Sequence, residues 1–187
     1  MKKIIAIGLV LMFGCIVQGY AAATDTCAMS VTVTVAKSVA ITDDPLVFAS
    51  VAANNTTGVV SNSAATVTND GTTTQDYNLQ ITDRPSTWSV LETAGNPGDE
   101  QFKLFAMFAS GTPVAGDFSD VSAEDVVKLG ATTNASSTVY AKNDQGADVK
   151  GTSCTATSVR NLWFRFVPPA STVLTTVQGI TVTVTAF

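Results

Sequence analysis

Alternation of polar and apolar residues with a period of two is the feature of this sequence that most restricts its fold. Residues 30–41, SVTVTVAKSVAI, and residues 179–187, GITVTVTAF, place valine or isoleucine at nearly every second position. Successive side chains of a β-strand point to opposite faces, so this pattern is typical of a strand with one buried face. We therefore expect a fold built from strands.

Strand signals of this kind recur along most of the chain. The expected strands cover residues 30–41, 45–50, 64–69, 75–82, 87–92, 102–109, 137–142, 161–167 and 179–187. Turn signals such as the NDG at 69–71 separate them. Together they predict an all-β fold, an antiparallel β-sandwich of about nine strands with at most one short helix. A capping-box pattern at Ser122 and Asp125, followed by Gly130, places that helix at 122–130.

One expected strand lacks the alternation. Residues 102–109, FKLFAMFA, are apolar in both phases, with Phe102 and Phe108 in one phase and Phe105 and Met107 in the other. A strand that is apolar on both faces is central in its sheet, or its outer face is covered by another segment.

The first 23 residues have the composition of a secretory signal peptide. Lys2 and Lys3 precede an uncharged apolar run that ends in three alanines. We expect cleavage after Ala23, which leaves residues 24–187 as a single β-sandwich domain without a transmembrane segment. A retained membrane anchor and a lipoprotein modified at Cys15 are the alternatives. Export places the protein in the periplasm, at the cell surface or outside the cell.

Two cysteines, Cys27 and Cys154, remain after that cleavage. An even number of cysteines in an exported chain usually forms disulfides, so we predict one bond between them. The bond closes a loop that the chain-entropy description values at about 5 kcal/mol of stability. Two free thiols are the alternative.

Charge and composition exclude several classes of function. Without Lys2 and Lys3, eight basic residues stand against fifteen acidic ones, a net charge of about −7. The basic surface that nucleic acid requires is therefore absent. The chain also has no histidine, which removes histidine-based acid–base catalysis, Ser-His-Asp triads and histidine metal sites. We expect no enzyme activity and no cofactor.

A weak calcium motif lies in the polar loop before Cys154. The sequence NDQGAD offers oxygen ligands from Asn143, Asp144 and Asp148 around a glycine. Carboxylate and amide oxygens are the ligands that Ca²⁺ prefers, although the closing glutamate of an EF-hand loop is missing.

The strand at 161–167, NLWFRFV, carries a candidate binding face. Its alternation points Leu162 and Phe164 inward and gives Trp163 and Arg165 the opposite face. An exposed indole beside a guanidinium would stack on a sugar or dock a protein neighbour. The alternative is that both faces are covered and Trp163 belongs to the core.

The segment LVFASVAANNTTGVVSNSAATVTNDGTTTQDYNLQIT, residues 46–82, resembles the immunoglobulin-like β-sandwich domains of secreted bacterial surface proteins. The elements that carry this resemblance are Phe48 and Val51, then Val67, Asn69 and Gly71, then Leu79 and Ile81. The end of the chain, a strand, a proline-containing loop and a final alternating strand, is similar to the way such domains close. The resemblance covers about a third of the chain; it implies the sandwich fold and a surface location but no single activity.

The terminal strand suggests how such a protein works. Its apolar residues Ile180, Val182 and Val184 share one phase and threonines hold the other. Such a strand closes its own domain or pairs with another subunit. We therefore predict an exported, non-catalytic structural protein, a subunit of a surface layer, fimbria or extracellular fibre, whose partners are copies of itself. The alternative is a monomeric binding module, an adhesin for a glycan or a surface protein.

Overall fold

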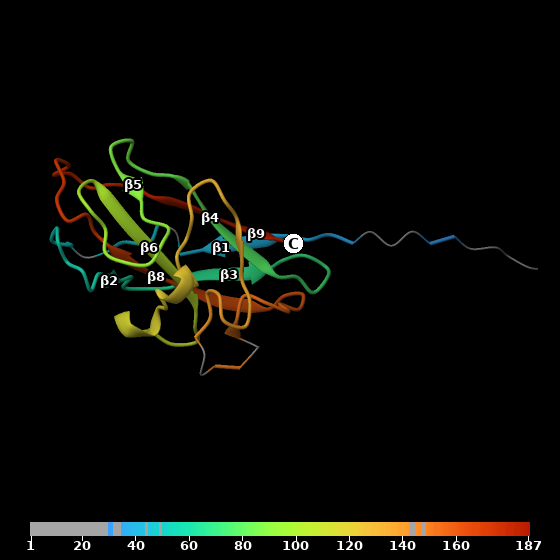
Figure 1. Cartoon of the computed structure of the whole chain (residues 1–187). Coiled ribbons are helices and arrows are strands. Elements are labelled where there is room, and N and C mark those ends of the chain that lie inside the picture. The colour runs from blue at the N-terminus through green and yellow to red at the C-terminus, as the bar shows by residue number, and fades with distance from the viewer. Residues whose placement is uncertain (1–29, 32–34, 44, 49, 143–144, 147–148) are drawn as a thin grey trace, which may run out of the picture. The chain divides into compact units, whose positions relative to one another are not determined.

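The computed structural model describes residues 30–31, 35–43, 45–48, 50–142, 145–146 and 149–187 of the chain (Figure 1). The chain divides into two compact units, Met1–Val33 and Thr34–Phe187. The described residues of the first unit, Ser30 and Val31, are both exposed. The described part of the second unit is all-β, with the short 3-10 turns η1 (Ala115–Asp117) and η2 (Val121–Ala123). Within the described residues, no helix has the length and apolar character needed to cross a membrane.

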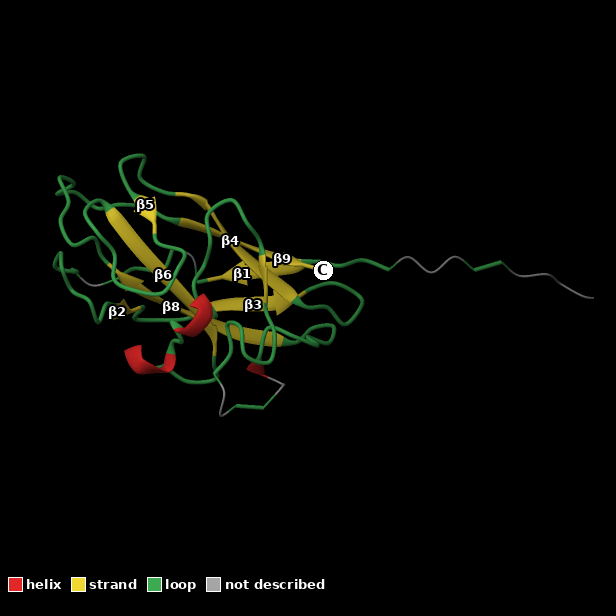
Figure 2. Ribbon diagram, viewed as in Figure 1, coloured by secondary structure: helices red, strands yellow, loops and turns green. Residues whose placement is uncertain are grey.

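The strands of the second unit form two sheets (Figure 2). They are β1 (Val39–Thr42), β2 (Val59–Val60), β3 (Ala65–Asn69), β4 (Tyr77–Asp83), β5 (Ser89–Val90), β6 (Gln101–Phe108), β7 (Thr133–Asn134), β8 (Val159–Val167) and β9 (Thr181–Ala186). The larger sheet has the order β1-β3-β8-β6-β5, and β2 also pairs with β8; the smaller has the order β7-β4-β9. The predicted all-β class is confirmed.

One hydrophobic core joins residues of the two sheets. On β4, Tyr77, Leu79 and Ile81 are fully buried, while the residues between them are half-buried. Val67 of β3 and Leu162 of β8 bring the larger sheet into the same cluster. Period-two alternation thus identified the buried face of these strands correctly, because each strand has one face toward the facing sheet.

A second, smaller core lies on the other face of the larger sheet. Phe105 and Met107 of β6 and Trp163 of β8 pack there against Phe118 and Val126, which come from the segment between β6 and β7. The expectation that residues 102–109 form a strand that is central in its sheet or covered on its outer face is therefore confirmed. β6 is also internal to its sheet, since it pairs with β8 on one side and with β5 on the other.

The pairing of β5 with β6 is parallel, which corrects the prediction of an antiparallel sandwich throughout. Ser89 lies opposite Gln101 and Val90 opposite Phe102. The connection between the strands doubles back through the glycine- and proline-containing loop 91–100, so β5 and β6 run in the same direction. This places the ring of Trp88 5.7 Å from that of Phe102, and burial of the indole stabilises the arrangement.

The helix predicted at 122–130 is wrong. Only the 3-10 turn η2 forms, and Ser122 has φ 52° within it. The residues that follow run extended beside β6: the N–H of Ala106 donates to the carbonyl of Asp125 (2.9 Å), and the N–H of Val127 donates to the carbonyl of Leu104 (2.8 Å). Helix capping contributes only about 1 kcal/mol, so hydrogen bonding to β6 and burial of Val126 and Val127 favour the extended conformation over a helix.

Other predicted strands are shorter than expected or absent among the described residues, and that expected at 87–92 is reduced to the two residues of β5. Of 30–41, only β1 is a strand, and part of the remainder lies outside the described residues. Residues 45–48 and 50 form none, and the strand predicted at 137–142 is replaced by turns, with Tyr140 at φ 54°. The short strand β7 pairs with β4 instead.

Candidate interaction edge

The terminal strand β9 lies at the edge of the smaller sheet. It pairs antiparallel with β4, with Val184 opposite Leu79 and Val182 opposite Ile81. In the part of the chain that the structure describes, β4 is the one strand paired with β9. Along its other edge β9 therefore carries backbone N–H and C=O groups that no described strand pairs, and such an edge is a template for a further strand.

The two faces of β9 differ as the sequence predicted. Val184 is buried at 8% exposure, and Val182 and the preceding Ile180 are half-buried. The alternating threonines are exposed on the outer face. The predicted pairing edge is thus an edge strand whose apolar side chains are only partly covered.

The larger sheet also ends in an edge strand close to β9. β1 pairs with β3 alone among the described strands, and residues of β1 approach β9 without pairing with it (Figure 1). Between them opens a cavity of about 400 Å³, here called the β1–β9 groove. The side chains that define its walls are Ile41, Leu46 and Phe48 on one side and Ile180, Val182 and Val184 on the other.

The floor of this groove is the core itself. Leu104, Leu162 and Phe164 of the larger sheet line it. The residues around it include no charged side chain, so its chemistry suits an apolar occupant. The sequence identified the β9 wall, but not Leu46 and Phe48, because their approach to β9 depends on how distant segments fold together.

The candidate binding face on β8 is not a free surface. Trp163 is 8% exposed, and its Nε1–H donates to the carbonyl of Ala109 (3.2 Å), so the alternative that Trp163 belongs to the core is the correct one. Arg165 is half-buried, and its guanidinium lies 4.6 Å from the centre of the Phe105 ring. Nε–H of Arg165 donates to the carbonyl of Thr57 (2.8 Å).

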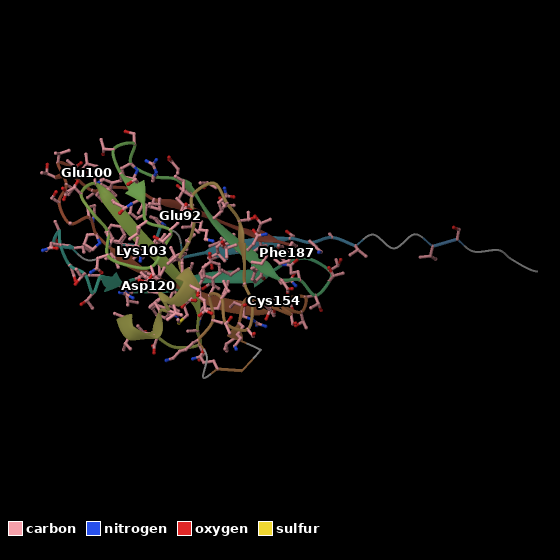
Figure 3. All side chains as sticks on the ribbon, in the orientation of Figure 1. Glu92, Glu100, Lys103, Asp120, Cys154 and Phe187 are labelled. Atoms are coloured by element: carbon pink, nitrogen blue, oxygen red, sulfur yellow. The ribbon has the colours of Figure 1, made fainter. Side chains whose placement is uncertain are left out.

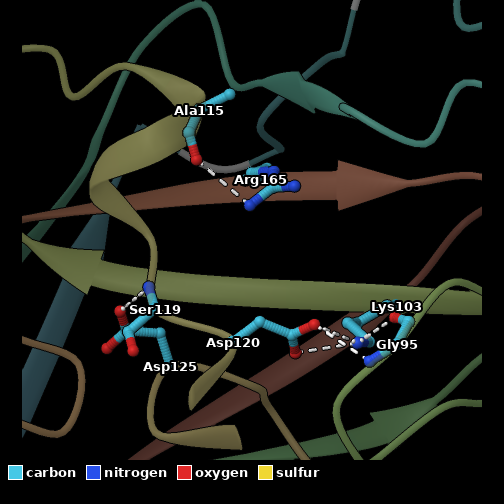
Figure 4. Close-up of polar contacts among 7 residues, drawn as sticks. All are labelled: Gly95, Lys103, Ala115, Ser119, Asp120, Asp125 and Arg165. Atoms are coloured by element: carbon cyan, nitrogen blue, oxygen red, sulfur yellow. Dashed lines mark hydrogen bonds and ion pairs between the residues drawn. The ribbon is translucent and has the colours of Figure 1, made fainter.

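Figure 4 shows a further donation from Arg165, to the carbonyl of Ala115 (3.1 Å). Burial lowers the pKa of the guanidinium from its ordinary value. Its two hydrogen bonds join the carbonyls of Thr57 and Ala115 to β8. Arg165 therefore has a structural task, and the indole it was predicted to accompany is not available for stacking.

An ion pair between a buried lysine and a partly exposed aspartate, which the sequence did not reveal, lies on the same face. Lys103 is 1% exposed, and its Nζ donates to both carboxylate oxygens of Asp120, at 2.8 and 3.0 Å, and to the carbonyl of Gly95 (Figures 3 and 4). A lysine in a strand covered on both faces needs such a partner, because burying an unpaired charge is costly. The sequence signal for this ion pair was the position of Lys103 in a segment, 102–109, that is apolar on both faces.

Asp125 is the second buried charge of this region. It is 1% exposed, and its Oδ2 accepts a hydrogen bond from the N–H of Ser119 (2.6 Å; Figure 4). Burial raises the pKa of Asp125 to about 7, and the neighbouring carboxylate of Glu124 acts in the same direction. The burial of Tyr140 raises its pKa to about 12, and the charge of Asp125 adds to that shift. Neither the β1–β9 groove nor the cavity lined by Ala109, Arg160 and Asn161 includes Asp125 among its lining residues.

The remaining predicted sites fall wholly or partly outside the described residues. Cys154 is buried with a free thiol, whose Sγ lies 3.6 Å from the carbonyl of Lys150, and burial raises the pKa of this thiol. Cys27 lies outside the described residues, so its bond to Cys154 stays a prediction. The calcium candidates Asn143, Asp144 and Asp148 also lie outside them. Elsewhere in the described chain, no group of three or more His, Cys, Asp or Glu residues could hold a metal ion.

Comparison with protein families, with curated proteins and with solved structures finds no match to this chain. The resemblance to immunoglobulin-like surface domains therefore remains a prediction from the residues that carry it. In the described part of the chain, β9 and β1 are edge strands with no second strand partner beside the β1–β9 groove.

Proposed function

We propose that the protein is an exported, non-catalytic structural subunit whose copies associate to form a surface layer, fimbria or extracellular fibre. The observation that supports this most is the free edge of β9. Natural sheets usually blunt an edge with charges, prolines or a covering segment. Among the described residues none of these protects β9: its sequence TVTVTA is uncharged and contains no proline, and its apolar side chains border an open groove.

The other properties of the chain agree with a structural task. The buried groups Lys103 and Asp125 bond to Asp120 and to the N–H of Ser119 and so join segments of the fold. The β1–β9 groove is lined by apolar side chains together with Thr181 and glycine, and no charged side chain lines it. The adhesin alternative loses the aromatic platform on which it depended, because Trp163 is in the core.

The test compares the oligomeric state of the wild-type protein with that of variants that carry a charge on β9 or on the neighbouring strand β4. Thr183→Lys places a cation on the exposed face of β9, and Gln80→Lys places the same cation opposite it on the internal strand β4. Both positions face the same side of the sheet, so the two variants differ in whether the strand has a free edge. We expect wild-type protein and Gln80→Lys to associate in sedimentation velocity, and Thr183→Lys to associate at least tenfold more weakly. A monomeric wild-type protein at every concentration would contradict the proposal.

A further inference from the structure

The β1–β9 groove is an incomplete part of the sandwich. Its floor consists of core residues such as Leu162 and Phe164, which in a closed sandwich are covered by side chains of the facing sheet. Here the smaller sheet ends at β9 and the larger at β1, and nothing among the described residues fills the space between them. One more strand with apolar side chains on one face would cover the floor and pair the free edge of β9.

The chain itself contains a segment with the required pattern. Residues 27–36, CAMSVTVTVA, are uncharged, and Met29, Val31, Val33 and Val35 occupy one phase. Two of these valines are among the described residues and are strongly exposed, Val31 at 74% and Val35 at 63%. At about 3.3 Å per residue, eight extended residues span about 26 Å, which exceeds the length of the groove wall at 179–184.

The anchoring of Ala36 argues that this segment serves another copy. The N–H of Thr72 donates to the carbonyl of Ala36 (2.9 Å), and the N–H of Ala36 donates to Oγ1 of Thr72 (3.1 Å). These bonds fix the chain at the end where β1 begins, beside Asn69, whereas the groove is lined by residues from Ile41 onward. A segment preceding Ala36 reaches its own groove only by reversing direction there, and the segment of a neighbour needs no such turn.

We infer that residues 27–36 of a second copy of this chain occupy the β1–β9 groove as an added strand along β9. The inference rests on the proposed structural function and names the surface and the partner through which it operates. Because the donor segment and the acceptor groove are different surfaces, the contact is heterologous, and repetition from copy to copy builds an open chain of subunits.

The experiment introduces acidic residues into the segment 27–36, at the positions whose side chains would face the groove. Val31→Asp with Val33→Asp puts two carboxylates on the face that enters the groove, and Ser30→Asp with Thr32→Asp puts the same charge on the opposite phase. Val31 is exposed, so its replacement removes little packing. We expect the control to associate like wild type and the valine variant to associate at least tenfold more weakly, with an unchanged near-ultraviolet circular dichroism spectrum.

A mixing experiment tests whether the contact is heterologous. Ile180→Asp damages the groove wall and leaves the donor segment intact, whereas the variant with Val31→Asp and Val33→Asp has the reverse defect. Each variant alone is expected to be monomeric, and an equimolar mixture is expected to form a complex of one copy of each. A mixture that stays monomeric while wild type associates would overturn the inference.

Two outcomes separate this inference from the proposed function. If the valine variant associates like wild type while Thr183→Lys does not, the copies pair through β9 without the donor segment; the inference fails and the proposed function stands. If wild-type protein is monomeric at every concentration, both fail. The predicted bond from Cys27 to Cys154 would tie the donor segment to its own copy, so Cys27→Ser is expected to leave association unchanged or stronger. Loss of association in Cys27→Ser would overturn the inference in favour of a covalent link between copies.

Discussion

The two edges of the larger sheet differ in whether other segments of the chain pair with them. On the side of β6, the chain covers its own strand with three successive segments: β5, residues 125–127, and the turn at 140–141. On the side of β1 and β9, two edge strands approach each other and leave a groove with an apolar floor. Segments of this chain therefore pair with the edge of β6, whereas no described segment pairs with the outer edge of β9. On the closed side the β6 edge is paired within the chain, whereas on the open side the described residues leave the edges of β1 and β9 without a second strand.

The largest expected effect is at the closed side. Phe102 is fully buried, and its ring lies 5.7 Å from that of Trp88 and 5.8 Å from that of Phe166. Phe102→Ala removes the centre of this aromatic cluster, and we expect the free energy of unfolding to fall by about 4 kcal/mol. Urea denaturation measures it. A loss below about 1 kcal/mol would show that the closed side does not carry the stability assigned to it.

A smaller effect, dependent on pH, is expected at Asp125 on the same side. Its pKa is raised from 3.8 to about 7 in the folded protein, so between these values the folded chain binds a proton that the unfolded chain has released. The contribution of this group is fully present below about pH 4 and is lost as the pH rises to about 7 and above. A shift of this size corresponds to at most about 4 kcal/mol.

The variant Asp125→Asn isolates this group from the other carboxylates. It keeps the side-chain shape and an acceptor for the N–H of Ser119, and it has no charge to desolvate. We expect the stability of wild type relative to Asp125→Asn, measured by urea denaturation, to fall between pH 4 and pH 8. A difference that is constant over this range would show that Asp125 is not protonated in the folded protein.

These two regions also show what the sequence could predict. Wherever one face of a strand meets the other sheet, as at Tyr77, Leu79 and Ile81, the alternation of the sequence gave both the strand and its buried face. At β9 it likewise gave the phase of Val182 and Val184. The local sequence is enough for this prediction, because the alternation of polar and apolar residues reports which face of a strand is buried and nothing more.

The predictions failed where distant partners decide the structure. Residues 125–127 carry a helix-capping pattern but become a strand-like segment, because β6 offers backbone partners and a covered apolar face. The direction of β5 depends on how the loop 91–100 returns, and the burial of Trp163 depends on the segment that carries Phe118. The groove has the same origin, since it exists only because β1 and β9 come close without pairing.

The smallest expected effect on stability sharpens the comparison at the open edge. Val184 and Val182 lie on one strand and in one phase, but Val184 is buried while Val182 is half-buried at the groove wall. Val184→Ala should therefore cost about 2 kcal/mol of unfolding free energy and Val182→Ala about 1 kcal/mol or less. Association should follow the opposite order, because both side chains line the groove but Val182 is the more exposed of the two, whereas most of the Val184 side chain is buried in the core. Urea denaturation and sedimentation velocity on the same two variants measure both quantities. Equal losses of association, or a larger loss for Val184→Ala, would mean that binding at β9 only reflects the stability of the strand; a larger loss for Val182→Ala would separate the surface that binds from the core that folds.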